Sequence, residues 1–231
     1  MGVHDGHRAR LKERFTEYGL DNFNDLNVLE LLLFFVIPRQ DTNIIAHALL
    51  DRFGSLDAVF EASSQELQAV PGIGANAAVL IRLVPDIAKR CAVSKTRDIT
   101  TFTSAASAAR YLIPRLSSEK AEKVYLLCLN AQKQLISCIE LGAGVVDNVG
   151  VNVRFVVETA LKTRASSVIM AHNHPSGNPA PSRDDELLTR RIREALQLVD
   201  VTLDDHIVIG GQAWFSFAES GLLLYPAPGL Y

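Results

Sequence analysis

The stretch that decides the fold covers residues 171–185, AHNHPSGNPAPSRDD, and begins where the apolar run SSVIMA ends. Such a run is typical of a buried strand, and alternate side chains of a strand share one face, so His172 and His174 should point the same way. The loop that follows is rich in residues that end a strand and turn the chain, namely Pro175, Gly177, Pro179 and Pro181. Ser182 and Asp185 then have the spacing of a helix N-cap and a residue of the first turn. The sequence therefore predicts a strand, a loop and a helix that carry the chain from His174 back to Asp185.

The chain around this stretch has two parts with different patterns. From residue 25 to 91 the apolar residues recur at helical spacing between turn and capping residues, which predicts an all-α domain over residues 1–97. Residues 92–104 lose that periodicity, as a linker would. Beyond them, strand-like apolar runs alternate with helical segments. We therefore expect a mixed α/β (α+β) domain over residues 98–231, mostly antiparallel at its hairpins.

The composition limits the classes of function. The 231 residues are 48% hydrophobic and carry a formal charge of −3, so the chain as a whole does not attract nucleic acid or anionic membranes. No apolar run reaches the roughly 18 residues that span a bilayer, and the polar, basic start is no signal peptide, so we expect a cytoplasmic protein with no membrane partner. The three cysteines form no C-x-x-C pair, which argues against disulfides and against a thiolate zinc site.

A second pattern lies in the helical part, where two helical segments flank the hairpin PGIG at residues 71–74. It resembles the helix-hairpin-helix motif of non-sequence-specific DNA binders, in which backbone amides beside a helix N-terminus hold a phosphate. However, no Lys or Arg follows Gly74, and residues 1–97 contain 11 Lys/Arg against 12 Asp/Glu. Two interpretations stay open: weak, non-sequence-specific DNA binding through the hairpin at Gly72 and Gly74, or a turn that only packs two helices.

The two imidazoles and the carboxylate of His172, His174 and Asp185 are the three-ligand set that leaves a catalytic zinc ion one open position. A structural zinc site would be closed by a fourth ligand, often a cysteine. A zinc nucleobase deaminase needs H-x-E and P-C-x-x-C, and both motifs are absent. The letters HNH are present, but the nuclease motif of that name spreads over a longer unit. The spacing H-x-H-x7-S-x2-D therefore predicts a Zn²⁺ site that is open to water.

That spacing resembles the JAMM signature of MPN (JAB) domains, and the variant HNHPSG…PSRDD looks like the RadC family of bacterial DNA repair proteins. Other RadC-like segments run through nearly the whole chain: GHRARLKERF, LELLLFFVIPRQDT, FGSL, VPGIG, VRFVVETALK and DDHIVIG. The resemblance implies a helix-hairpin-helix region followed by an MPN domain with a cytidine-deaminase-like α-β-α core. It also implies that His172, His174 and Asp185 bind zinc. Ser182 matches the serine of the motif, which in relatives helps hold the oxyanion or the water at the metal.

JAMM proteases hydrolyse amide or isopeptide bonds, so the resemblance implies a zinc metallopeptidase with a peptide or protein substrate. Their general base is a glutamate from an early strand, outside the motif. Glu122, Glu140 and Glu158 compete for this role. We favour Glu122, because it precedes the first strand after the domain's opening helix, where the family's glutamate enters. The alternative is that Glu122 is a solvated charge in the run SSEKAEK.

Two functions remain open at this point. The first is a JAMM-type hydrolase, and the second is a DNA-binding or DNA-repair protein in which the MPN domain is an interaction module. Asn173 lies where many JAMM proteases have Ser or Thr, which matches RadC proteins and leaves the substrate range open. Asp205 and His206 precede the apolar run IVIGG. They either orient a ligand imidazole or form a hydrogen-bonded strand end.

Overall fold

The structure, a computed structural model, describes residues 3–141 and 151–223. The chain divides into two compact units, Met1–Arg90 and Cys91–Tyr231, and each is described by itself. No helix within the described ranges is both long enough and apolar enough to cross a membrane.

The first unit is helical, as predicted. Four of its helices begin at a polar N-cap whose side chain accepts from a backbone amide of the first turn. The apolar faces of the helices pack into one core. Its fully buried members include Leu29, Leu33, Leu49, Leu67 and Ile81. The helices are α1 (Val3–Tyr18), α2 (Asp25–Leu33), α3 (Thr42–Phe53), α4 (Leu56–Glu61), α5 (Ser64–Gln68) and α6 (Ala75–Ser94).

The predicted hairpin lies between α5 and α6. Ser63 and Glu66 form a capping box at the start of α5, and Gly72 turns the chain with a φ of 92°. A Cβ at Gly72 would lie 2.7 Å from Ile45 Cδ1, so both the backbone and the packing against α3 favour glycine there. After the hairpin, α6 runs through Pro85 and continues to Ser94, three residues into the predicted linker, and residues 86–94 contain no further Pro and no Gly to end it. The hairpin packs helices together, and its binding to DNA stays a prediction.

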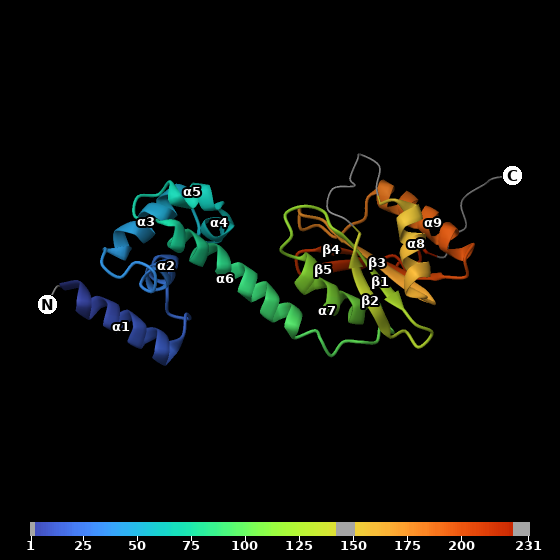
Figure 1. Ribbon diagram of the computed structural model, residues 1–231, viewed down its shortest axis with the longest axis horizontal. Coiled ribbons are helices and arrows are strands. Elements are labelled where there is room, and N and C mark those ends of the chain that lie inside the picture. Colours follow the sequence, from blue (N-terminus) through green and yellow to red (C-terminus); the bar gives the residue numbers. More distant parts are fainter. Residues whose placement is uncertain (1–2, 142–150, 224–231) are drawn as a thin grey trace. The chain divides into compact units, whose positions relative to one another are not determined.

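The second unit is a mixed α/β domain, as predicted (Figure 1). Its five strands form one sheet in the order β2-β1-β3-β4-β5. Neighbouring strands are antiparallel except β3 and β4, which are parallel and joined through α9. The elements are α7 (Ala105–Leu116), β1 (Val124–Leu129), β2 (Leu135–Glu140), α8 (Val153–Thr163), β3 (Ser167–Asn173), α9 (Arg183–Gln197), β4 (Thr202–Gly210) and β5 (Ala213–Ser216).

The sheet lies between two helical layers, with α7 on one face and α8 and α9 on the other (Figure 1). Side chains alternate between these layers along β3: Ile169 packs with α7, whereas Met170 packs with α8 and α9. Every residue of β3 is buried, because helices cover both of its faces. The same alternation directs His172 toward the face of α8 and α9, and Asn173 toward the face of α7.

Candidate metal centre

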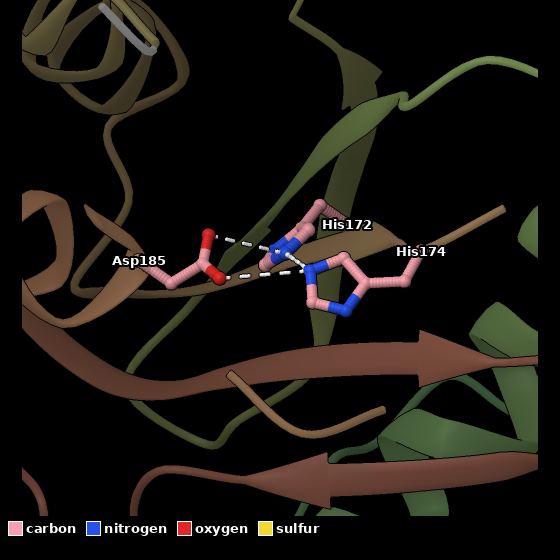
Figure 2. A group of neighbouring side chains, drawn as sticks. All are labelled: His172, His174 and Asp185. Carbon is pink, nitrogen blue, oxygen red and sulfur yellow. Dashed lines mark hydrogen bonds and ion pairs between the residues drawn. The ribbon is translucent and has the colours of Figure 1, made fainter. Parts of the chain in front are cut away.

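Three side chains converge at the C-terminal end of β3 (Figure 2). His172 comes from β3, His174 from the loop after it and Asp185 from the first turn of α9. The two histidine Nε2 atoms are 3.0 Å apart, and the carboxylate oxygens of Asp185 lie 3.3 Å from His172 Nε2 and 3.5 Å from His174 Nε2. Among the described residues, no other group of three His, Cys, Asp or Glu side chains is arranged to hold a metal ion. The structure thus brings together the three residues that the sequence predicts as ligands.

Backbone contacts fix the loop that carries His174. The amide of His174 donates to the Ile209 carbonyl of β4 at 2.8 Å. Gly177 then turns the chain with a φ of 80°, and its amide donates to the His174 carbonyl. Gly210 makes room for this turn, because a Cβ there would lie 2.5 Å from both the Gly177 carbonyl oxygen and the Pro179 nitrogen. The loop is therefore held by close packing of backbone on backbone.

Ser182 and Asp185 form a capping box at the start of α9. The amide and the hydroxyl of Ser182 donate to Asp185 Oδ2 at 2.7 and 2.6 Å, and the Asp185 amide donates to Ser182 Oγ at 3.1 Å. Burial raises the pKa of Asp185, but the hydrogen bonds from Ser182 and the nearby imidazoles outweigh it, so the pKa lies below the ordinary aspartate value. Ser182 thus holds the carboxylate ionised and in place.

A hydrogen bond determines which ring nitrogen of His174 carries the proton. Nδ1 of His174 lies 2.8 Å from the carbonyl oxygen of Asn178. A carbonyl oxygen only accepts, so Nδ1 must carry the hydrogen. In the neutral ring the lone pair is therefore on Nε2, the atom that faces His172 and Asp185.

A longer chain of hydrogen bonds determines the tautomer of His172. The Thr189 hydroxyl donates to the Asp185 carbonyl at 2.6 Å, so its oxygen is left to accept from His206 Nδ1, which is also 2.6 Å away. His206 Nε2 then accepts from His172 Nδ1 at 2.8 Å. His172 Nε2 keeps its lone pair, which points at His174 and Asp185.

Burial keeps the two linked imidazoles neutral. Burial is the largest effect on His172 and lowers its pKa to about 4, although the nearby Asp185 carboxylate acts in the opposite direction. His206 has no exposed surface, and burial lowers its pKa well below the ordinary histidine value. At neutral pH each ring therefore carries one proton, and each of these protons lies in a hydrogen bond directed away from the cluster.

The three facing groups of the cluster are all acceptors, with no hydrogen to share among them. Lone pairs at 3.0 Å repel, and Asp185 adds a negative charge, so the partner that this donor set fits is a cation. Zinc binds imidazole nitrogen and carboxylate oxygen at about 2.0–2.2 Å, which sets the donors of a tetrahedral site roughly 3.3 Å apart. The separations of 3.0, 3.3 and 3.5 Å in the structure match that requirement. The residues present fit a zinc ion, for which they would supply three ligands.

Glu122, the favoured general base, is exposed and does not belong to the three-residue cluster. It lies two residues before Val124, which pairs directly with His172 across β1 and β3. The structure thus places Glu122 just before the start of β1, the strand that pairs with β3.

The other two candidate bases, Glu140 and Glu158, accept hydrogen bonds from residues outside the cluster. Glu140 lies opposite Tyr125 in the sheet and accepts from its hydroxyl at 3.0 Å. Tyr125 packs against the core under α7, and directly paired residues share a face, so Glu140 lies on the face opposite to His172. Glu158 accepts from Arg154 on the exposed side of α8 at 2.7 Å. Neither residue points into the cluster.

Asn173 lies between His172 and His174, and its hydrogen bonds connect the segment around Glu122 to β3. It is only 2% exposed. Its Oδ1 accepts from the Lys123 amide at 2.8 Å, and its Nδ2 donates to the carbonyls of Glu119 and Ala121 at 3.2 and 3.1 Å. These three bonds surround Glu122 in sequence, so the position of Glu122 is coupled to that of the ligands.

Only some of the groups behind the three-residue cluster could be predicted from the sequence. Of the two interpretations of the Asp205-His206 pair, the structure supports one for each residue: His206 bonds His172, whereas Asp205 accepts from the Ser216 hydroxyl and organises the strand end. Thr189 and Asn178 were not identified. Thr189 follows Asp185 by one helical turn, a spacing that could have indicated it. Asn178 acts through its backbone carbonyl, which no side-chain pattern reveals.

A family model described as a RadC-like JAB domain matches residues 102–222, which is more than half of the chain and includes the whole cluster. The chain belongs to the RadC family. A RadC-family relative, "UPF0758 protein FN0909" of Fusobacterium nucleatum subsp. nucleatum, is 36% identical over 225 residues that cover 94% of this chain and 97% of the relative. The RadC resemblance seen in the sequence is thus confirmed, and it extends beyond the JAB domain into the helical unit.

Proposed function

We propose that this RadC-family chain is a zinc-dependent hydrolase of the JAMM type that cleaves peptide or isopeptide bonds. The observation that carries the proposal is the convergence of two imidazole Nε2 atoms and one carboxylate within 4.8 Å. Three protein ligands are the number found in catalytic zinc sites, whereas structural sites have four. The match to a JAB domain supports the same reading, because the His172, His174 and Asp185 spacing is that of the JAMM motif.

Zinc, when bound, would lower the pKa of a water molecule to about 7 and polarise the carbonyl of the scissile bond. The chain would supply orientation and proton transfer. We assign to Glu122 the removal of the proton from the attacking water and its delivery to the leaving amine. In an extended backbone Glu122 shares the face of Val124 and His172, which supports this assignment. Ser182 holds Asp185 by donating its hydroxyl hydrogen to the carboxylate, so it would stabilise a developing oxyanion only by turning that hydrogen away from Asp185.

A DNA-binding function is the second candidate, and the hairpin at Gly72 favours it. Gly72 and Gly74 are both exposed, and the helix α6 that follows them is long enough to have a dipole. Its first turn carries no basic side chain, so binding would be weak and would disappear at moderate salt.

One pair of assays separates the two functions. Zinc-loaded protein is incubated with a mixed peptide library and with a lysine-linked isopeptide, and the products are followed by mass spectrometry with and without a chelator. We expect chelator-sensitive cleavage that disappears in His172→Ala. Intact substrates, together with a salt-dependent shift of duplex DNA that ignores zinc, would instead support the DNA-binding function.

A further inference from the structure

We propose that Thr189 and His206 are positioning residues that fix the tautomer of His172 and thereby set the zinc affinity of the site. This inference rests on the proposed metal site, since it concerns how one of its ligands is oriented. Neither residue contacts the position of the ion. Both lie behind His172: His206 comes from β4 and bonds the ring of His172, and Thr189 comes from α9 and bonds His206.

One atom in this series of hydrogen bonds can only accept, and it determines the direction of all the others. The carbonyl of Asp185 can only accept, so the Thr189 hydroxyl gives its hydrogen to it. The Thr189 oxygen therefore accepts from His206 Nδ1, and His206 Nε2 is free to accept from His172 Nδ1. Reversal of any one bond would leave two donors or two acceptors facing each other.

This series of hydrogen bonds joins Asp185 and His172, two members of the same cluster. It starts at the backbone of Asp185, passes through Thr189 and His206, and ends on the ring of His172. The carboxylate of Asp185 and the Nε2 of His172 then meet again at 3.3 Å. The orientation of one ligand is thus linked to that of the other through a closed ring of contacts.

Within the described residues, the side chains of His206 and Thr189 make no hydrogen bonds besides those of this series. His206 is fully buried in β4, where it lies opposite Met170, and its ring stacks on Phe217 with 4.7 Å between centroids. Thr189 is 3% exposed. Water cannot replace a missing hydroxyl or imidazole easily at such depth, so loss of one partner should leave His172 free to adopt the other tautomer. In that tautomer His172 Nε2 carries a hydrogen and cannot bind a metal.

The chain offers matched substitutions. Thr189→Val removes the hydroxyl at nearly constant volume, whereas Thr189→Ser keeps it. Thr163 in α8 is the control, because its hydroxyl donates to the Thr159 carbonyl four residues earlier in the same way, away from the cluster. His206→Leu removes both ring nitrogens, whereas His206→Gln retains one acceptor and one donor.

Zinc affinity is measured by competition with a chromophoric chelator on the full chain, and protein stability by urea unfolding without metal. We expect Thr189→Val and His206→Leu to weaken zinc binding about 10- to 100-fold, and Thr189→Ser, His206→Gln and Thr163→Val to stay within a few fold of the wild type. Unchanged zinc affinity in folded Thr189→Val would overturn the inference, even where His172→Ala still abolishes binding and so upholds the metal site.

The ring nitrogens of His172 give a second readout that needs no metal. In ¹H–¹⁵N spectra of the metal-free protein at neutral pH, we expect wild-type His172 to carry its hydrogen on Nδ1, and Thr189→Val to show a mixture of tautomers. An unchanged spectrum in Thr189→Val would contradict the inference. Failure of the wild type to bind zinc would refute the proposed function, while the tautomer comparison would still decide the positioning role.

Discussion

Two loops in this chain lead into helices through glycines, and they differ in what they present to a ligand. The hairpin before α6 offers backbone amides, and the first turn of α6 carries no acidic or basic side chain. The loop before α9, together with the end of β3, offers two imidazoles, and the first turn of α9 carries Asp184, Asp185 and Glu186. The helix dipole is the same in kind at both sites. The difference teaches that side chains with fixed tautomers, and not the loop or the dipole, make the second loop a candidate metal site.

The largest expected effect concerns Glu122, the proposed general base beside the second loop. Glu122→Gln should retain zinc and lower the turnover of a cleaved peptide by about 10²- to 10⁴-fold, because the amide cannot accept a proton from water. Glu140→Gln is the control, since Glu140 bonds Tyr125 on the other face of the sheet. Full activity of Glu122→Gln, measured as turnover at saturating substrate, would remove Glu122 from the mechanism.

Gly210→Ala tests the backbone packing that holds the metal loop. The added Cβ would meet backbone atoms of Gly177 and Pro179 at 2.5 Å, which cannot move without displacing Asn178. Since the Asn178 carbonyl orients His174, we expect zinc affinity to fall at least about 10-fold. Chelator competition measures this directly, and wild-type affinity in the variant would show that the loop tolerates the shift.

Gly72→Ala makes the corresponding change in the hairpin, with a different result. Its Cβ would meet the flexible end of Ile45, and its positive φ is unfavourable for alanine, so the free energy of unfolding should drop by about 1–2 kcal/mol. Zinc affinity should stay unchanged, because the hairpin belongs to the other unit. A loss of zinc without a loss of stability in urea unfolding would contradict the separation of the two loops.

Without metal, the stability of the protein should also depend on pH. Folded His172 takes a proton only near pH 4, while the unfolded chain takes it near 6.5. The unfolded state therefore binds more protons between these values, so stability must fall as the pH drops through that window. From pH 6.5 to 5 the loss due to His172 should be about 1.5 kcal/mol in urea unfolding with chelator. His172→Gln should reduce this slope, and an equal slope in both proteins would assign the effect to other groups.

The sequence predicted the parts of this fold that depend on local pattern. Apolar spacing revealed the helices of the first unit, and the order of strand, loop and helix placed His172, His174 and Asp185 near one another. The packing behind His172 depends on the pairing of β3 with β4, in which Met170 lies opposite His206. Such a register joins residues that are far apart in the chain, and no local pattern specifies it. The same limit applies to the bonds from Asn173 to the segment around Glu122.

The central claim is that the cluster binds zinc through its acceptor atoms, and metal content tests it most directly. The measurement is zinc per chain in protein purified without added metal, for the wild type, Asp185→Ala and the neighbouring Asp184→Ala. Asp184 is exposed in the same helical turn but lies outside the cluster. We expect about one zinc per chain in the wild type and in Asp184→Ala, and almost none in Asp185→Ala. Equal zinc in all three proteins, or none in the wild type, would contradict the account.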